Sequence, residues 1–332
     1  MAQTPQSNCT LEQMATLLLE CDDFVICGHV SPDGDCLGSQ LALMCALRRL
    51  GKRANVVLVK EDAVEGNLQA TLPFVDELVP ASQYVGACKT FIGVDVPTRE
   101  RIGEAACELL DAADTSFTID HHAVETTMCQ HVHVDPDAAA TTLLIWELTS
   151  YLGVSRDGDF ATCCYTGLVT DTGRFQFQNT DERAFRLAAE MVAAGAEAAE
   201  ISREIFQNRT LASVKLEGVA ISQMALDLES GVAITHLELS DFEACGAMKS
   251  DAEPIIDVLR CIAGVRAACV LREQEDCIRG SLRAKDATDV SAVAREFGGG
   301  GHVAAAGFTL HCEMEEAFNK VKEAMLKAVR AL

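Results

Sequence analysis

Short apolar runs alternate with longer amphipathic stretches through the first half of the chain. Compact apolar runs of the kind that form buried strands lie at residues 24–27, 54–59, 90–96 and 116–119. Helical patterns precede, separate or follow them at residues 11–20, 37–50, 100–112 and 138–152. Thr10 and Gln13 have the spacing of a capping box, and Gly51 and Gly153 follow two of the helices. Strands that alternate with helices predict an α/β fold with a doubly wound, mostly parallel sheet.

The pattern changes in the second half of the chain. Three helices are expected first, at about residues 159–169, 181–194 and 197–206. Strands are then expected at 219–226, 232–237, 265–271 and 278–283, with helices at 253–263, 290–297 and 315–331. We therefore predict two domains, 1–195 and a smaller α/β domain at 213–332, joined by a helical linker at 196–212.

The charge balance restricts the classes of partner. The formal net charge is −23, with 13 Lys and Arg against 31 Asp and Glu in residues 1–208, and 14 against 19 in residues 209–332. Such a surface argues against broad binding of long duplex nucleic acid, which needs basic residues to displace counterions. No apolar run reaches the roughly 18 residues that span a bilayer, and the first residues lack a basic, apolar leader. We expect a cytoplasmic protein without membrane contact.

The fifteen cysteines do not indicate a disulfide scaffold. No Cys-x-x-Cys pair occurs, so neither a thiolate zinc site nor a redox motif is supported. Cys27, Cys45, Cys163, Cys261 and Cys269 lie inside apolar periodic stretches. We expect the cysteines to be reduced and to act as small core residues.

Asp and His residues are concentrated just after four of the predicted elements. They are His29, Asp33 and Asp35; Asp95; Asp120, His121 and His122; and Asp171. In an open parallel sheet, ligands bind beyond the carboxyl ends of the strands. The first three groups follow strands and are expected to meet at that edge, whereas Asp171 ends a helix and has to reach it separately.

These groups indicate a metal centre. One Asp after a strand is most often a cap or turn residue, and adjacent His residues also occur in ordinary loops. All four groups together exceed what turns require, and they cannot converge as bare charges because repulsion and desolvation would be prohibitive. Oxygen and imidazole ligands suit Mn²⁺, with Mg²⁺ or Co²⁺ as substitutes. Asp33 and Asp35 are two residues apart, so each can serve one of two ions that promote in-line displacement at phosphorus.

The second half contributes a glycine-rich segment. Gly298, Gly299, Gly300 and Gly301 are followed by His302, and Arg283 lies upstream at the end of a predicted strand. Successive glycines let backbone N–H groups approach an anion, and Arg binds phosphate or carboxylate through a bidentate fork. On glycine content alone, a flexible hinge or turn is the alternative interpretation.

The motifs resemble those of the DHH family of phosphoesterases with a C-terminal DHHA1 domain. HVSPDGDCLGS, VD, DHH and TDTGRF match the first four family motifs, at residues 29–39, 94–95, 120–122 and 170–175. SLRAKD and GGGGHVAAAGF are similar to the DHHA1 signature, although Ala284 stands where the family commonly has Ser. Length and layout are most similar to the stand-alone group of oligoribonucleases that also dephosphorylate 3′-phosphoadenosine 5′-phosphate (pAp).

The resemblance implies a role for each site residue. One Mn²⁺ would be held by His29, Asp33 and Asp95, and the other by Asp35, Asp95, His121 and Asp171, with Asp95 bridging. Asp120 would orient His121, and His122 would face the scissile phosphate. Arg283, the glycines at 298–301 and His302 would bind the far end of the substrate across a cleft between the domains. Arg101 is either a phosphate contact or a surface charge of a helix.

The implied function is Mn²⁺-dependent hydrolysis of short oligoribonucleotides to mononucleotides, with removal of the 3′-phosphate of pAp. A phosphodiesterase for pApA or cyclic di-AMP is the alternative. A family II pyrophosphatase has a basic motif where this chain has GGGGH, and a RecJ-type exonuclease has a longer chain. A non-catalytic nucleotide-binding regulator would have lost metal ligands, and none is missing. The preferred substrate, the direction of degradation, the metal bound in the cell and the oligomeric state, a homodimer included, stay open.

Overall fold

A computed structural model describes residues 7–61, 64, 66–123 and 127–330, except for the side chain of His302. The chain divides into two compact units, Met1–Asn208 and Arg209–Leu332, and each is described by itself. The division falls inside residues 196–212, where helix α8 (Ala198–Phe206) lies. The assignment of that segment as a linker stays a prediction.

The N-terminal unit is built on a six-stranded parallel sheet. Its strands are β1 (Phe24–Cys27), β2 (Ala54–Leu58), β3 (Val79–Pro80), β4 (Thr90–Val94), β5 (Thr115–Asp120) and β6 (His131–Val134). The strand order is β3-β2-β1-β4-β5-β6, and every neighbouring pair is parallel. This is a common doubly wound order, in which the chain changes direction between β1 and β4. Ligands of such sheets bind at this switch point, beyond the carboxyl ends of the strands.

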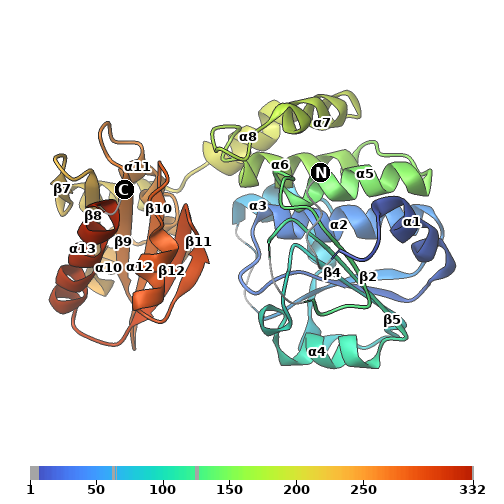
Figure 1. Cartoon of the computed structure of the whole chain (residues 1–332). Coiled ribbons are helices and arrows are strands. Elements are labelled where there is room, and N and C mark those ends of the chain that lie inside the picture. The colour runs from blue at the N-terminus through green and yellow to red at the C-terminus, as the bar shows by residue number, and fades with distance from the viewer. Residues whose placement is uncertain (1–6, 62–63, 65, 124–126, 331–332) are drawn as a thin grey trace. The chain divides into compact units, whose positions relative to one another are not determined.

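Helices cover both faces of this sheet. They are α1 (Leu11–Glu20), α2 (Gly34–Arg49), α3 (Gly66–Thr71), α4 (Gly103–Ala112), α5 (Thr141–Leu152), α6 (Asp159–Asp171), α7 (Glu182–Ala193) and α8. Helices α1, α2, α5 and α6 pack together over one face, and α4 lies on the other (Figure 1). Strand β1 is buried on both sides, because Phe24 and Ile26 enter the core under α2 while Val25 and Cys27 enter the core under α4.

The C-terminal unit contains a second six-stranded sheet, with the order β11-β12-β10-β9-β8-β7. Its strands are β7 (Ala225–Asp227), β8 (Val232–Leu237), β9 (Ala267–Glu273), β10 (Ile278–Ala284), β11 (Gly300–His302) and β12 (Ala305–Leu310). Its helices are α9 (Leu211–Ser222), α10 (Leu239–Cys245), α11 (Ile255–Arg260), α12 (Val290–Glu296) and α13 (Met314–Arg330). Strands β8 and β9 pair in parallel, and the other neighbouring strands described in this sheet pair antiparallel. Helices α12 and α13 form one core with the sheet, and α9, α10 and α11 form the other.

The predicted α/β class and the parallel sheet are confirmed. Strands β1 and β8 and helix α1 begin and end at the predicted residues, and Thr10 and Gln13 make the predicted capping box. Helix α2 begins earlier than predicted, at Gly34, because Asp33 caps it. Strand β6 was not predicted, since its four residues include His131 and His133 and give a weak apolar pattern.

One predicted strand is wrong. Residues 219–226 form the end of helix α9 and the short strand β7. Helix α9 buries Leu216 and Ala220 but leaves Leu211, Val214 and Ile221 exposed, so apolar residues lie on both of its faces. Apolar periodicity cannot identify such a helix, because the pattern lacks a polar face.

The cysteines and the chain surface give two further results. All fifteen cysteines are unpaired. Cys27, Cys45, Cys163 and Cys269 are buried as predicted, but Cys261 is exposed just beyond the end of α11.

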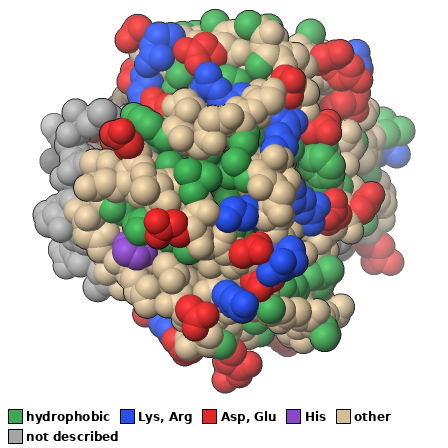
Figure 2. Space-filling model, turned by 90° about the vertical axis from the view of Figure 1, so that its right-hand side faces the viewer, with side chains coloured by type: hydrophobic (Ala, Val, Ile, Leu, Met, Phe, Trp, Pro, Cys, Tyr) green, Lys and Arg blue, Asp and Glu red, His purple; other side chains and the backbone are tan. Residues whose placement is uncertain are grey.

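On the face shown in Figure 2, acidic and basic side chains are intermingled around apolar ones. Within the described residues, no helix is both long enough and apolar enough to cross a membrane.

The close approach of α2 and α6 generates a test of the N-terminal unit. A Cβ on Gly38 of α2 would lie 2.5 Å from the backbone oxygen of Cys163 in α6. Gly38→Ala therefore has to separate the two helices, and we expect the free energy of unfolding to fall by about 1–3 kcal/mol in urea titrations. Gly218→Ala in α9 is the matched control, since a Cβ there would meet no atom within 4 Å. There we expect no loss, and a gain of up to about 1 kcal/mol. Equal stability of the two variants would contradict the packing described.

Candidate metal centre

The predicted Asp and His residues meet at the switch point of the parallel sheet. His29 follows β1, Asp95 follows β4 and Asp120 is the last residue of β5, and these three strands are neighbours in the sheet. Asp35 enters from the first turn of α2, and Asp171 ends α6. We call His29, Asp33, Asp35, Asp95, His121 and Asp171 the acid–imidazole cluster.

The spacing inside the acid–imidazole cluster is that of ligands around ions. His29 Nε2 lies 3.4 Å from Asp95 Oδ2 and 4.0 Å from Asp33 Oδ2. His121 Nε2 lies 3.5 Å from Asp95 Oδ1, 3.8 Å from Asp171 Oδ2 and 4.0 Å from Asp35 Oδ2. These distances are longer than ordinary hydrogen bonds. Ligand atoms about 2.0–2.2 Å from one tetrahedral ion stand roughly 3.4 Å apart, so the arrangement fits divalent cations.

Asp95 lies between the two imidazoles. Its Oδ2 faces His29 and its Oδ1 faces His121, so the two carboxylate oxygens point toward different groups of ligands. Its backbone has φ 53°, a left-handed conformation that is uncommon for Asp, and its N–H donates to Ile119 O at 3.0 Å. Thr141 Oγ1 donates to Asp95 Oδ1 at 3.0 Å. These two contacts hold the backbone and the carboxylate of Asp95 in this uncommon conformation.

Both imidazoles are held through their Nδ1 atoms. His29 Nδ1 lies 2.9 Å from Val30 O, and His121 Nδ1 lies 3.0 Å from Ala138 O. A carbonyl can only accept, so Nδ1 carries the proton in both rings. When the ring is neutral, as in a metal-bound imidazole, its lone pair is on Nε2, which in each case faces the carboxylates. This is the usual arrangement of metal-binding His residues.

Asp120 orients a different ring from the one that the family resemblance implies. Its Oδ1 accepts from His122 Nδ1 at 2.7 Å and from the backbone N–H groups of His121 and His122 at 2.8 and 3.1 Å. The ring of His121 is oriented by the Ala138 carbonyl instead. Asp120 Oδ2 is buried and has no hydrogen-bond partner in the described part of the chain.

The first turn of α5 supports Asp35. Thr141 N and Thr142 N donate to its two oxygens at 2.6 and 2.9 Å, and Thr142 Oγ1 donates at 2.8 Å. A helix N-terminus stabilises such an anion through its unpaired N–H groups. Thr141 and Thr142 were not identified from the sequence, because the helix was expected to begin at residue 138. The available signal was a pair of hydroxyl residues at the start of an apolar helix.

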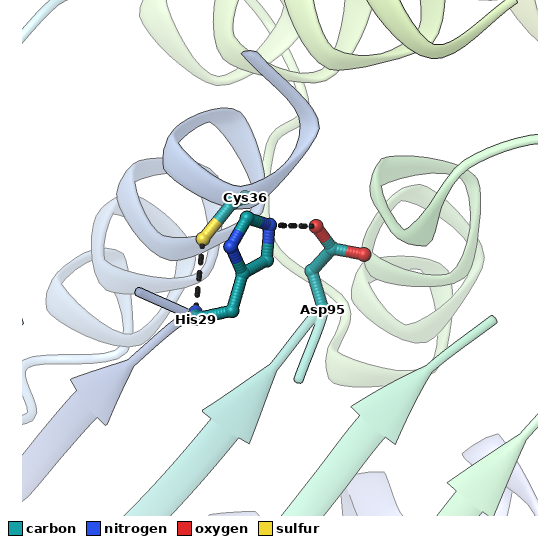
Figure 3. Close-up of side chains that lie close together, drawn as sticks. All are labelled: His29, Cys36 and Asp95. Atoms are coloured by element: carbon teal, nitrogen blue, oxygen red, sulfur yellow. Dashed lines mark hydrogen bonds and ion pairs between the residues drawn. The ribbon is translucent and has the colours of Figure 1, made fainter. Parts of the chain in front are cut away.

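A thiol lies within the same region. The first turn of α2 places Cys36 with His29 and Asp95 in a group whose ligand atoms all lie within 4.8 Å of one another (Figure 3). Two further groups are Asp35, His121 and Asp171, and Asp95, His121 and His122. No thiolate was implicated from the sequence, because the expected signal for one was a Cys-x-x-Cys pair. The chain thus contains groups of side chains able to hold divalent metal ions.

Burial and mutual charge keep protons on this region when no ion is bound. Burial and the neighbouring Asp95 raise the pKa of Asp35 to about 7. Burial opposes protonation of His121, but the charges of Asp171 and Asp95 raise its pKa to about 10. The pKa of Asp171 is also raised, mainly by burial. Burial raises the pKa of Asp95 too, but the hydrogen bond from His29 and the charge of His121 outweigh it, so this pKa is lowered.

The C-terminal candidates lie in the second sheet. Residues Arg283 of β10 and His302 of β11 both pair with Ala305 of β12, so the three backbone positions form one row across the sheet. Burial lowers the pKa of Arg283, and no ion pair involves it in the described part of the chain. The side chain of His302 lies outside the described residues. Arg101 ends a short 3-10 helix (Arg99–Arg101), and its backbone oxygen accepts from Val30 N at 2.8 Å.

The predicted glycine loop is in part an edge strand, since Gly300 and Gly301 belong to β11. A Cβ on Gly299 or Gly301 would lie 2.2 Å from Gly307 O or 2.5 Å from Ala305 O. Close packing against β12 therefore requires these two glycines. Gly298 and Gly300 have open space around them, and Gly298 has φ 73°. A larger side chain would therefore find space at position 300, so packing does not explain why this residue is a glycine.

The fold and site define an α/β protein with side chains able to hold divalent ions at its switch point. The model of the DHH family, N-terminal domain, matches residues 23–168, and that of the DHHA1 domain matches residues 242–331. The chain is 32% identical to the bifunctional oligoribonuclease and PAP phosphatase NrnA of Thermus thermophilus, over 90% of this chain and 88% of that protein. It is 30% identical to the Bacillus subtilis protein of the same name, over 87% and 90%. The chain belongs to the DHH family of phosphoesterases, with a DHHA1 domain in its C-terminal unit.

Solved structures and more distant relatives agree with this assignment. An exopolyphosphatase-related protein from Bacteroides fragilis has a TM-score of 0.90 and 26% identity, and the match covers 97% of both chains. The cyclic-di-AMP phosphodiesterase GdpP of Geobacillus thermodenitrificans is 26% identical, but the match covers only 48% of that protein.

The protonated state of the metal-free cluster generates a pH test. The folded pKa values of Asp35 and His121 lie above their usual ones, so between pH 5 and 8 the folded state binds more protons than the unfolded state. The free energy of unfolding in EDTA is therefore expected to fall as pH rises through this window. Thermal unfolding in EDTA at several pH values measures it.

Asp35→Asn removes one of these titrating groups and is expected to flatten the slope between pH 5 and 7. Mn²⁺ replaces the protons, so the increase in Tm that it causes should become larger with rising pH. A Tm in EDTA that rises between pH 5 and 8 would contradict the assigned protonation.

Proposed function

We propose that the protein hydrolyses short oligoribonucleotides to mononucleotides and removes the 3′-phosphate of pAp, using two Mn²⁺ ions. The main support for this proposal is the acid–imidazole cluster. In it, one carboxylate oxygen of Asp95 faces the imidazole of His29 and the other faces the imidazole of His121. Relatives at 32% and 30% identity, matched over most of both chains, bear the names of these two activities. Mg²⁺ and Co²⁺ are the substitutes for Mn²⁺ that the same oxygen and nitrogen donors would accept.

The proposed ligands divide into two sets that share Asp95. His29 and Asp33 complete one set, and Asp35, His121 and Asp171 complete the other. The measured distances of 3.4–4.0 Å within each set support this division. The ions would neutralise the phosphate and supply a water of lowered pKa.

The chain itself would position the reacting groups. His122, whose Nδ1 is held 2.7 Å from Asp120 Oδ1, would contact the scissile phosphate. The contacts of Thr141, Thr142, Val30 and Ala138 keep the ligands oriented before substrate arrives. Such preorganisation lowers the barrier because little reorganisation remains for the reaction itself.

Basic residues elsewhere would select short substrates. Arg283 is half-buried, and we propose that it binds a phosphate of the substrate, together with Gly298, Gly300 and His302. Arg101 is proposed as a second phosphate contact because its backbone bonds to the residue after His29. The net charge of −23 and the intermingled charges of the face in Figure 2 support short oligonucleotides over long duplexes.

Hydrolysis of pApA or cyclic di-AMP is the second candidate. The cyclic-di-AMP phosphodiesterase relatives favour it, but this chain covers only 45–48% of their length at 24–26% identity. The two relatives at 32% and 30% identity, which match over about 90% of their own length, carry the oligoribonuclease and PAP phosphatase names.

A substrate panel tests the proposed function. We expect release of mononucleotides from a five-nucleotide RNA and of phosphate from pAp with Mn²⁺, and neither in EDTA. The panel also contains pApA, cyclic di-AMP and pyrophosphate. His121→Ala removes one ligand and should lower kcat/KM by about 100-fold or more. His311→Ala, an exposed His in the C-terminal unit, is the control and should retain full activity. Faster hydrolysis of cyclic di-AMP than of RNA and pAp would favour the second candidate, and no turnover of any substrate would refute a phosphoesterase.

Arg283 is tested separately. Arg283→Ala should raise KM for a dinucleotide by about 10-fold to 100-fold, because a charged hydrogen bond contributes about 1.5–3 kcal/mol. Arg279→Ala removes an exposed guanidinium from the same face of β10 and should leave KM unchanged. Steady-state kinetics of both variants give the comparison. Equal effects of the two substitutions would show that Arg283 acts only through net charge.

A further inference from the structure

The sulfur of Cys36 is buried beside two proposed metal ligands. Cys36 is fully buried in the first turn of α2, and the backbone N–H of His29 donates to its Sγ at 3.3 Å. Figure 3 shows the sulfur and the Asp95 carboxylate on either side of the His29 imidazole. The ligand atoms of all three residues lie within 4.8 Å of one another.

The backbone is shaped around this sulfur. A Cβ on Gly28 would lie 2.1 Å from Cys36 Sγ, so glycine at that position leaves the space that the sulfur fills. Space filling alone would be served by any small apolar side chain. It gives no account of a soft donor atom close to an imidazole whose Nε2 is directed at a carboxylate.

The two halves of the acid–imidazole cluster consequently differ in chemistry. The group of Asp35, His121 and Asp171 offers only oxygen and nitrogen, whereas the group of His29, Cys36 and Asp95 adds sulfur. Thiolate ligands favour Zn²⁺ and other softer ions, while carboxylate-rich sites suit Mn²⁺ and Mg²⁺. The ligand sets therefore predict unequal metal preferences at the two positions.

We propose that Cys36 is a metal ligand that makes the His29 side of the centre bind Zn²⁺ or Co²⁺ more tightly than the His121 side does, although Mn²⁺ can occupy both sides. This inference rests on the proposed metal centre. On binding, the S–H bond breaks, the proton passes to solvent and the sulfur lone pair binds the ion. Sulfur, nitrogen and oxygen ligands of one tetrahedral ion stand roughly 3.4–3.6 Å apart. The three ligand atoms here lie within 4.8 Å of one another, so the sulfur has to move toward the ion on binding.

Titration of the metal-free protein with Co²⁺ tests the inference, because thiolate bound to Co²⁺ gives a near-ultraviolet charge-transfer band. Co²⁺ bound only by oxygen and nitrogen gives weak visible bands alone. We expect the near-ultraviolet band in the unaltered chain and in Cys269→Ala, which removes a buried thiol from the other unit. We expect its loss in Cys36→Ala, and in Cys36→Ser should the alanine variant fail to fold.

Metal competition gives a second readout. Against a chromogenic chelator, Cys36→Ala should lower Zn²⁺ affinity by about tenfold or more, with Mn²⁺ affinity changed by less than about threefold. Visible Co²⁺ bands without the near-ultraviolet band in the unaltered chain would overturn the role of Cys36 and leave the metal centre intact. Persistence of the near-ultraviolet band in Cys36→Ala would also overturn it. Failure of Co²⁺ and Mn²⁺ to bind at all would refute the proposed centre itself.

Discussion

The structure depends on placing several carboxylates so close together that they cannot all be charged without a cation. Asp35 and Asp95 are almost completely buried, and Asp171 is close enough to share an imidazole with them. A doubly wound sheet brings this about because β1, β4 and β5 are neighbours and end at the same edge. Unpaired, such groups would cost several kcal/mol each in desolvation. In the metal-free protein, bound protons reduce the negative charge of the cluster and so reduce this cost, in line with the raised pKa values of Asp35 and His121. Divalent ions can replace these protons.

Backbone groups provide most of the contacts that orient these side chains. The carbonyls of Val30 and Ala138 fix two imidazole tautomers, and two backbone N–H groups at the N-terminus of α5 donate to Asp35. Such contacts come from the fold and need no particular partner side chain. The acid–imidazole cluster can therefore be rigid even though its members come from four separate parts of the chain.

The sequence was sufficient for the fold class, the strands that carry the site and the residues that meet there. Strands such as β1 were predictable because both faces are buried, which gives a continuous apolar run. Helix α9 was not, because apolar residues occupy its exposed face as well. The backbone groups that contact Asp35 and His121 could not be predicted, since any residue type offers a backbone N–H and a carbonyl, and only the hydroxyl of Thr142 was a signal in the sequence. The role of Asp120 toward His122 followed from local geometry that a motif does not contain.

The place of Cys36 beside His29 and Asp95 could not be found by motif matching. Asp33 and Asp35 have the spacing of the family motif, and that spacing does not include Cys36, the residue that follows them. Yet the first turn of α2 directs Cys36 Sγ to the end of β1, beside the ring of His29. The residues proposed to hold the two ions are thus separable from the one proposed to set metal preference. A change at this single position can alter the chemistry of one ion, because neither the helix cap of Asp33 nor the contacts of Asp35 involve the sulfur.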